Sequence, residues 1–161
     1  MGAREYFLPA PARAGTGRPR EAAALAGIGR RASAFLLDYI LTLMAPAATL
    51  VLGVYIKRTW QAPNAASVIV VLGYLATAAV IFVNHIYFCV QDGRSFGKRF
   101  IGLRIVRLDG APVDYPTALL RHLVGYPLAL LTLGISMLWI LWDEQHQGLH
   151  DKLAKTIVVA E

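Results

Sequence analysis

Three long apolar stretches constrain the fold of this chain more than any other feature. They cover residues 32–56, 65–90 and 123–142; the first contains one charged residue, Asp38, and the other two contain none. A helix of about 20 apolar residues is long enough to cross the hydrocarbon layer of a bilayer. Charged residues make up 16% of the chain, against about 25% in a typical soluble domain. The sequence therefore predicts an all-α membrane protein with three hydrophobic transmembrane segments.

The third stretch leaves two topologies open. Gly125, Pro127 and Gly134 divide it into pieces, and such residues in a membrane helix mark kinks and breaks. A straight crossing would put the C-terminus on the side opposite the N-terminus. A broken, re-entrant segment would return it to the same side.

The distribution of Lys and Arg predicts the orientation. Six precede residue 32, two lie between the first and second stretches, and six lie between the second and third. Because cytoplasmic flanks carry the excess of basic residues, we expect the N-terminus and the second connection in the cytoplasm, with the protein multi-pass in a bacterial inner (cytoplasmic) membrane. Residues 1–28, rich in Ala, Arg, Gly and Pro, are expected to form a tail that is disordered or loosely bound to anionic lipid.

One carboxylate inside the first stretch needs an explanation. Asp38 follows Arg31 by seven residues, so both lie on one face of a helix, about 10 Å apart along its axis. A carboxylate in mid-membrane costs on the order of 2.5–3.5 kcal/mol, so Asp38 is expected to face a partner. It is either a polar clamp that orients the helices, which we favour, or a proton or cation site.

The connection after the second stretch is basic and amphipathic. Apolar and basic residues alternate through residues 95–107, a pattern typical of an element in the lipid headgroup region. The residues expected to bind anionic headgroups are Lys98, Arg99, Arg104 and Arg107. A nucleic-acid role is not expected, because the two phenylalanines of this stretch are accounted for by the membrane edge.

The later part of this connection also carries a strand pattern. Residues 103–108 alternate, and Asp109-Gly110 is a strong turn signal. We therefore expect a short hairpin whose return strand begins at Val113.

Near the C-terminus, His146 and His150 lie four residues apart, close to Asp143 and Asp151. Histidines at this spacing on a helix can share a metal, but Gly148 intervenes and no third ligand is specified. A solvated polar cap is expected, and no metal.

The remaining polar residues of the second stretch are Asn84 and His85, near its end. We expect them to form a contact between helices. A catalytic arrangement would need a paired acid and base, and none is visible, so neither enzymatic activity nor a cofactor is expected.

Three motifs together resemble the RDD family of small membrane proteins. They are Arg31-Ala-Ser-Ala-Phe-Leu-Leu-Asp38, then Gly97-Lys-Arg-Phe-Ile-Gly-Leu-Arg-Ile-Val106, and the tail Trp142-Asp-Glu-Gln-His-Gln-Gly-Leu-His-Asp-Lys-Leu-Ala-Lys-Thr156. They follow in order over residues 29–160, which would form one RDD-like transmembrane domain.

The resemblance implies that Asp151 corresponds to the second of the aspartates that characterise the family, with Asp143 as the other candidate. If Arg31 and Asp151 form a unit, the tail is cytoplasmic, which favours the re-entrant third segment.

The sequence favours a non-catalytic function. Three spans enclose almost no aqueous path, and the second stretch offers small residues for helix packing, namely Gly73, Ala76, Ala78 and Ala79. We expect an accessory or assembly subunit that contacts anionic lipid headgroups and other membrane subunits or copies of itself. The alternative is a proton or cation transporter, antiport-like, in which Asp38 titrates, paired with Arg31 or also with His85.

Overall fold

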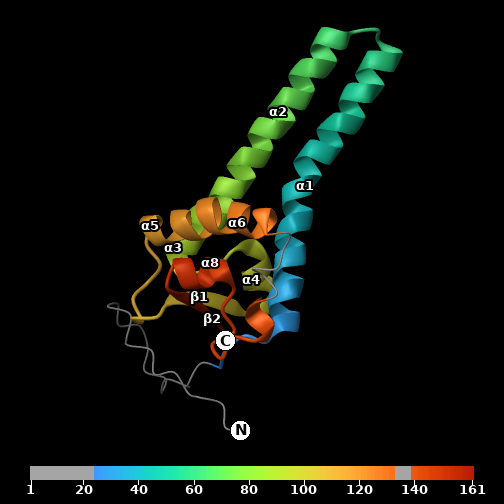
Figure 1. Cartoon of the computed structure of the whole chain (residues 1–161). Helices are drawn as coiled ribbons and strands as arrows, with labels where there is room; N and C mark the ends of the chain where they lie inside the picture. Colours follow the sequence, from blue (N-terminus) through green and yellow to red (C-terminus); the bar gives the residue numbers. More distant parts are fainter. Residues whose placement is uncertain (1–23, 133–138) are drawn as a thin grey trace.

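A computed structural model describes residues 24–132 and 139–161, and it consists of a long helical hairpin with a compact base at one end (Figure 1). Helix α1, Ile28–Thr59, is the first arm. The second arm is α2, Pro63–Ile81, continued by the π-helical turn η1, Phe82–Tyr87, and by α3, Phe88–Asp92. Both arms are long and apolar enough to cross a membrane. The first two predicted segments are therefore confirmed as helices of that kind.

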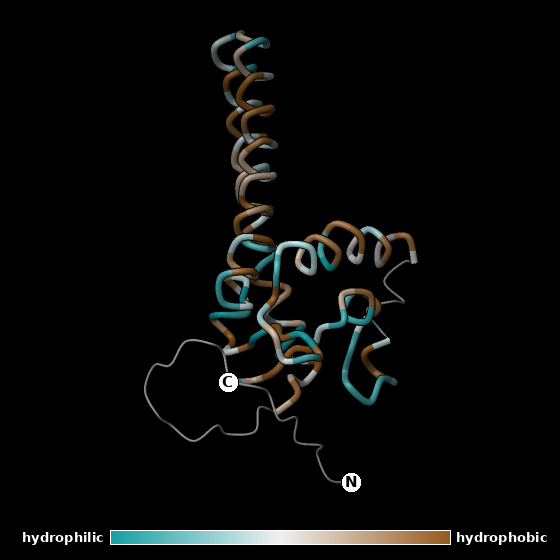
Figure 2. Tube along the Cα trace, turned by 90° about the vertical axis from the view of Figure 1, so that its left-hand side faces the viewer, coloured by the Kyte–Doolittle hydropathy of each residue, from teal (hydrophilic) through white to brown (hydrophobic). Residues whose placement is uncertain are grey.

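The two arms pack closely through small residues. A Cβ on Gly73 would lie 1.8 Å from Thr49 Oγ1, and one on Gly53 would lie 3.3 Å from the carbonyl oxygen of Ala66. Apolar residues, brown in Figure 2, occur along most of the hairpin, and only 11% of the most apolar part of each arm is buried. Large apolar side chains of both arms are therefore exposed on its outer surface. The arms thus bury small residues against each other and present large apolar ones outward.

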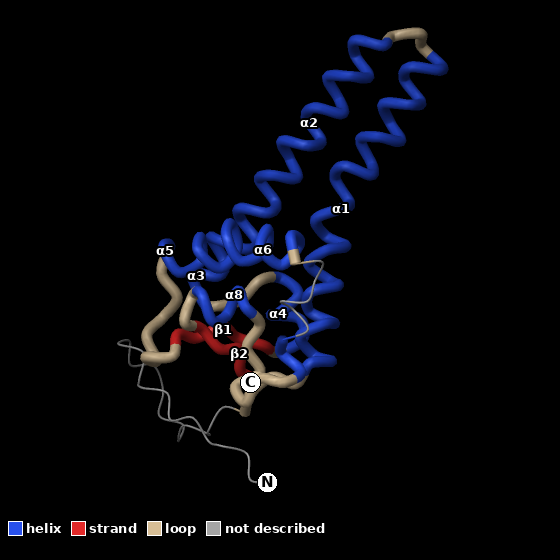
Figure 3. Tube along the Cα trace, in the orientation of Figure 1, coloured by secondary structure: helices blue, strands red, loops and turns tan. Residues whose placement is uncertain are grey.

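The base contains short helices and one small sheet (Figure 3). Its elements are α4 Phe96–Ile101, β1 Leu103–Arg107, α5 Tyr115–Leu119, the π-helical η2 Leu120–Val124, α6 Gly125–Leu131, the 3₁₀ turn η3 Trp139–Leu141, α8 Leu149–Leu153 and β2 Thr156–Ala160. The chain is mostly helical, but the prediction of an all-α fold is corrected by this sheet.

Strands β1 and β2 pair antiparallel, with Leu103 opposite Ala160 and Arg107 opposite Thr156. The strand predicted over residues 103–108 is confirmed as β1, Leu103–Arg107, but the predicted partner strand was wrong. Asp114 caps α5 by accepting a hydrogen bond from the Thr117 backbone N–H at 2.9 Å, so the chain after the turn enters a helix. The apolar C-terminal segment fills the place of the return strand.

The third apolar stretch does not form a third arm in the described part of the chain. Residues 115–131 are helical throughout, and this helix runs across the base of the hairpin at a large angle to both arms (Figures 1 and 2). Gly125 and Pro127 lie inside it and do not end it. Among the described residues only the two arms are long enough to span. Gly134 lies in residues 133–138, and most of the predicted tail in residues 1–23, all outside the described residues.

Candidate functional site

Where the hairpin meets the base, the Asp38 carboxylate is enclosed by hydrogen-bond donors. Oδ1 accepts from Asn84 Nδ2 and from the Gly97 backbone N–H, both at 2.8 Å, and Oδ2 accepts from Ser95 Oγ at 2.5 Å. The side chains of Asp38, Asn84 and Ser95 are buried. These four residues, here called the Asp38 cluster, join α1, η1 and the start of α4.

Glycines explain why α4 reaches this carboxylate. A Cβ on Gly97 would lie 2.1 Å from the carbonyl oxygen of Ala34, so only glycine lets α4 press against α1 here. Gly102 ends α4 with φ +70°, the left-handed region that glycine adopts without strain. The two glycines of the middle motif therefore fix where α4 lies and where it stops.

A second buried acid, Asp151, lies deeper in the base between two arginines. Asp151 Oδ2 accepts from Arg31 Nη1 at 2.9 Å, and Oδ1 pairs with Arg121 Nη1. Arg121 also donates to Thr156 Oγ1 at 2.5 Å, and the Gly148 backbone N–H donates to Asp151 Oδ2 at 3.1 Å. Asp151 and Arg121 are 0% and 2% exposed. This Asp151 cluster ties α1, η2, α8 and β2 together.

The charges around Asp151 determine its protonation state. Burial opposes the ionised carboxylate, but the charges led by Arg121 outweigh it and hold the pKa of Asp151 well below its usual range. His150 Nε2 lies 3.5 Å from Asp151 Oδ2. Burial nevertheless lowers the pKa of His150 to about 4, against the attraction of that carboxylate. At neutral pH the cluster therefore contains an ionised Asp151 beside a neutral His150.

Histidines from the two π-helical turns meet between the clusters. The rings of His85 in η1 and His122 in η2 have centroids 5.0 Å apart. Burial and the charge of Arg121 hold the pKa of His122 well below its usual value. Because π-helical turns often occur at functional sites, the polar centre spanning both turns is the candidate functional site of the described chain.

The structure brings the predicted polar residues into two groups, not one. Arg31 and Asp38 lie on the same side of α1, but Arg31 pairs with Asp151 and Asp38 with the Asp38 cluster. A pairing of Asp38 with Arg31 was therefore wrong. Two helical turns separate them, so each finds a partner at its own level. Asn84 does form the predicted helix–helix contact, with Asp38 as its partner.

The tail residues are also separated. Asp151, and not Asp143, contacts Arg31, and His150 lies beside it. Asp143 pairs with Lys152 and accepts from the Gln147 backbone N–H at 2.9 Å. The predicted solvated cap was wrong for His150 and Asp151, which are 7% and 0% exposed.

One of the four cations predicted to bind lipid headgroups, Lys98, does not lie at the surface, so the prediction was wrong for this residue. Its side chain is buried, and Nζ donates to Ser95 Oγ at 3.3 Å, because α4 turns it toward the Asp38 cluster. Burial and the charge of Arg121 lower the pKa of Lys98.

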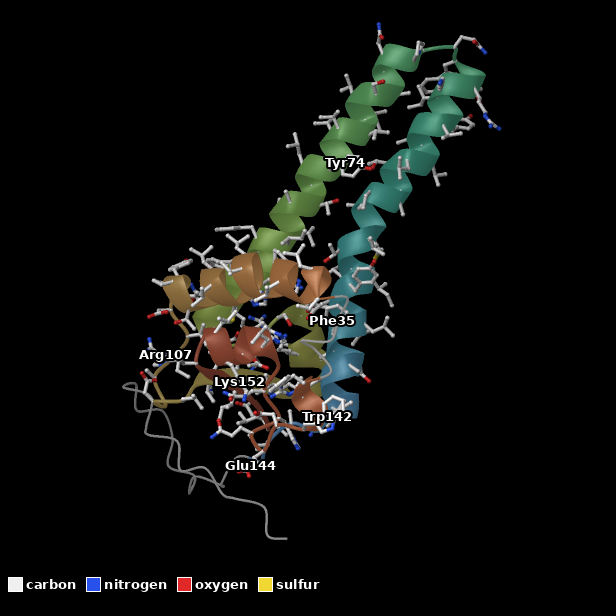
Figure 4. All side chains as sticks on the ribbon, viewed as in Figure 1. Phe35, Tyr74, Arg107, Trp142, Glu144 and Lys152 are labelled. Atoms are coloured by element: carbon white, nitrogen blue, oxygen red, sulfur yellow. The ribbon has the colours of Figure 1, made fainter. Side chains whose placement is uncertain are left out.

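The other three cations remain partly exposed at the surface of the base, each beside an acid. Arg99 pairs with Asp92 at 3.0 Å and Arg104 with Glu161 at 3.5 Å. Arg107, at the edge of the base (Figure 4), pairs with Asp109 of the turn after β1 and with Asp114, which caps α5. Their contact with lipid stays a prediction.

Sequence reasoning missed Arg121, Ser95 and Thr156 as site residues. In the sequence, Arg121 is one of the six basic residues between the second and third apolar stretches, and it was used only to predict the orientation in the membrane. Its signal was present, since Arg121-His122 occurs inside a leucine-rich helical pattern, where a charge must face the protein interior. Among residues 24–132 and 139–161 no group of side chains suited to holding a metal ion occurs.

The model of the RDD family matches residues 25–155. The chain is also 32% identical over 137 residues to the uncharacterized protein YckC of Bacillus subtilis (strain 168), covering 83% of each chain. It is 32% identical over 89 residues to the uncharacterized protein RP437 of Rickettsia prowazekii (strain Madrid E), which covers 55% of this chain and about half, 49%, of that protein. No solved structure matches. The matched region contains Arg31, Asp38 and Asp151, and the chain belongs to the RDD family.

Proposed function

We propose that this chain is a non-catalytic integral membrane protein of the bacterial cytoplasmic membrane. It acts as an accessory or assembly subunit that packs its hairpin against other membrane subunits. The N-terminus and the base lie in the cytoplasm. The proposal is supported by a hairpin whose outer surface is apolar and exposed over most of its length.

The observation that carries this proposal is the closed state of the Asp38 cluster. Three donors from Asn84, Ser95 and Gly97 occupy the carboxylate oxygens, which describes a structural clamp better than an ion-binding site. Beyond the clamp, Gly73 meets Thr49 too closely for a water path between the two arms. A single hairpin of this kind encloses no aqueous route across a bilayer.

The outer face of α2 supports contact with a partner helix. Gly73, one of the small residues expected to receive a partner, is buried against α1. Ala76, Ala78 and Ala79 remain exposed. Small residues let helix backbones approach closely in a membrane, so this face of α2 is the contact surface we propose.

Purification in mild detergent tests the proposal. We expect a membrane partner to co-purify in constant ratio with the native chain. Ala79→Phe, which adds bulk to the small-residue face, should release it. Leu72→Phe, two turns away on the same face where a large side chain already stands, is the matched control and should retain it. A native protein that runs only as a free monomer or homo-oligomer would contradict the proposal.

The alternative, a proton or cation transporter, has one observation in its favour: two basic side chains adjoin the Asp38 cluster. Lys98 Nζ donates to Ser95 Oγ, and His85 directly follows Asn84. Ion flux into proteoliposomes, compared between the native chain and Asp38→Asn, separates the two functions. Transport requires native flux that Asp38→Asn abolishes while the variant stays folded. The accessory function predicts no flux from either.

A further inference from the structure

The helix over residues 115–131 buries charged and polar side chains and exposes large apolar ones. Its buried residues include Arg121 and His122, together with Ala118 and Gly125. Apart from Tyr115 at its first position, its exposed large hydrophobic residues are Leu119, Leu120, Leu123, Val124 and Leu131. At 100° per residue these five fall in one arc of the helix, opposite the buried four. A helix on a water-facing surface has the opposite arrangement, with apolar residues inward and charges outward.

The contacts of the buried face fix the direction of the apolar stripe. Arg121 binds Asp151 of α8 and Thr156 of β2, and a Cβ on Gly125 would meet the His150 side chain. In Figure 1, α8 and the sheet lie on the side of this helix away from the hairpin tip. The leucine stripe therefore faces the side on which the hairpin extends. Figure 4 shows carbon side chains projecting from the helix on that side.

The level of this helix along the hairpin follows from one ring contact. The ring of His122 lies against the ring of His85, tilted by 36° and with the centroids 5.0 Å apart, and His85 directly follows Asn84, the partner of Asp38. From Asp38 to the end of α1 at Thr59, a helix rises about 32 Å, close to the thickness of a hydrocarbon layer of about 30 Å. The helix thus lies beside the hairpin at the depth where the hydrocarbon layer begins.

We infer that residues 115–131 form an interfacial helix in the plane of the bilayer. Its leucine stripe inserts among the acyl chains of the cytoplasmic leaflet, and its Arg121 face holds the base below them. Amphipathic helices bind membranes in this way, with the apolar face buried about 5–10 Å into the headgroup boundary. The occupant of the stripe is lipid. This helix neither crosses the membrane nor dips through it, so α8 and β2 stay on the cytoplasmic side with the N-terminus of α1.

Site-directed spin labelling of the purified full chain in liposomes tests this inference. Single cysteines replace Leu120, Leu123 or Leu131 in a Cys89→Ala background. Accessibility to oxygen, which dissolves in lipid, and to a water-soluble nickel chelate reports the depth of each label. Leu72→Cys, exposed near the middle of α2, is the deep control, and Asp109→Cys, exposed in the turn of the base, is the aqueous control.

An interfacial helix gives the same shallow depth at all three leucines, with more oxygen than nickel accessibility. A crossing helix instead deepens by about 12 Å between residues 123 and 131, which would overturn the inference. Values like those of Asp109→Cys would put the stripe in water, and exclusion of both reagents would put it against protein; either result overturns it. If the Leu72 label is deep while the leucine labels give either of these results, the interfacial helix is refuted but the membrane hairpin of the proposed function is not.

Discussion

Replacing Asp151 by asparagine tests whether the Asp151 cluster holds the base together. The substitution keeps the size of the side chain and removes its charge. Arg31 and Arg121, with side chains 10% and 2% exposed, would then lose the carboxylate that they share.

The expected loss follows from this burial. Removing one partner of a buried ion pair destabilises a protein by about 3–5 kcal/mol, because the remaining charge is left uncompensated. Here one carboxylate serves two guanidinium groups, so we expect the upper half of that range. Asp143→Asn is the matched control, since the side chain of its partner Lys152 is 40% exposed and such a pair contributes at most about 1 kcal/mol.

Tryptophan fluorescence during denaturant unfolding in detergent measures the difference. Trp139 and Trp142 lie in the base and Trp60 at the hairpin tip, so a Trp60→Phe background makes the signal report the base. Adding Arg121→Met to Asp151→Asn removes one uncompensated charge and should recover part of the loss. If Asp151→Asn costs no more than Asp143→Asn, the cluster does not stabilise the base and our reasoning is refuted.

Three further predictions concern stability. Lys98 is buried with no ion pair among the described residues, so Lys98→Met should leave the free energy of unfolding unchanged or raise it; a loss as large as that of Asp151→Asn would contradict this. Because the folded state holds the pKa of His150 at about 4, the unfolded chain takes up a proton first as the pH falls, so stability should drop between about pH 6.5 and 4, by about 3 kcal/mol. His150→Gln should flatten that slope in denaturant titrations at several pH values, and an unchanged slope would exclude His150 as its source. Gly97→Ala should cost about 1–3 kcal/mol through its clash with Ala34, whereas Gly29→Ala, with open space around it, should be neutral or stabilise α1; equal effects on the thermal midpoint would contradict this.

The hairpin could be predicted from the sequence because its signal is local. Length and lack of charge are sufficient to identify a helix that can cross a bilayer, and the need of Asp38 for a partner follows from the same reasoning. The identity of that partner does not, because Asn84, Ser95 and Gly97 come from distant segments. The spacing of Arg31 and Asp38 predicted correctly that both lie on one face of α1, but it predicted the wrong pairing. Residues on one face of a helix can lie at different levels along its axis and therefore meet different partners.

The base could be predicted only in part. Alternation identified the strand at residues 103–107, yet pairing depends on which distant strand is available, and the turn at Asp109-Gly110 pointed to the wrong one. Lys98 was predicted to bind anionic lipid headgroups because a basic residue in an amphipathic pattern usually faces outward. The contact of Gly97 with α1 turns that side chain inward, and this close approach of two backbones has no local signature.

The pairing of β1 with β2 has a consequence for the order of events during synthesis. The two strands come from either side of the third apolar stretch, and the bridge from Leu25 to Val159 ties the start of α1 to the same sheet. Chains emerge from the ribosome N-terminus first, so both arms are available for insertion well before β2 exists. The hairpin can therefore form without its base, and the base can close around the foot of α1 only once β2 has been made.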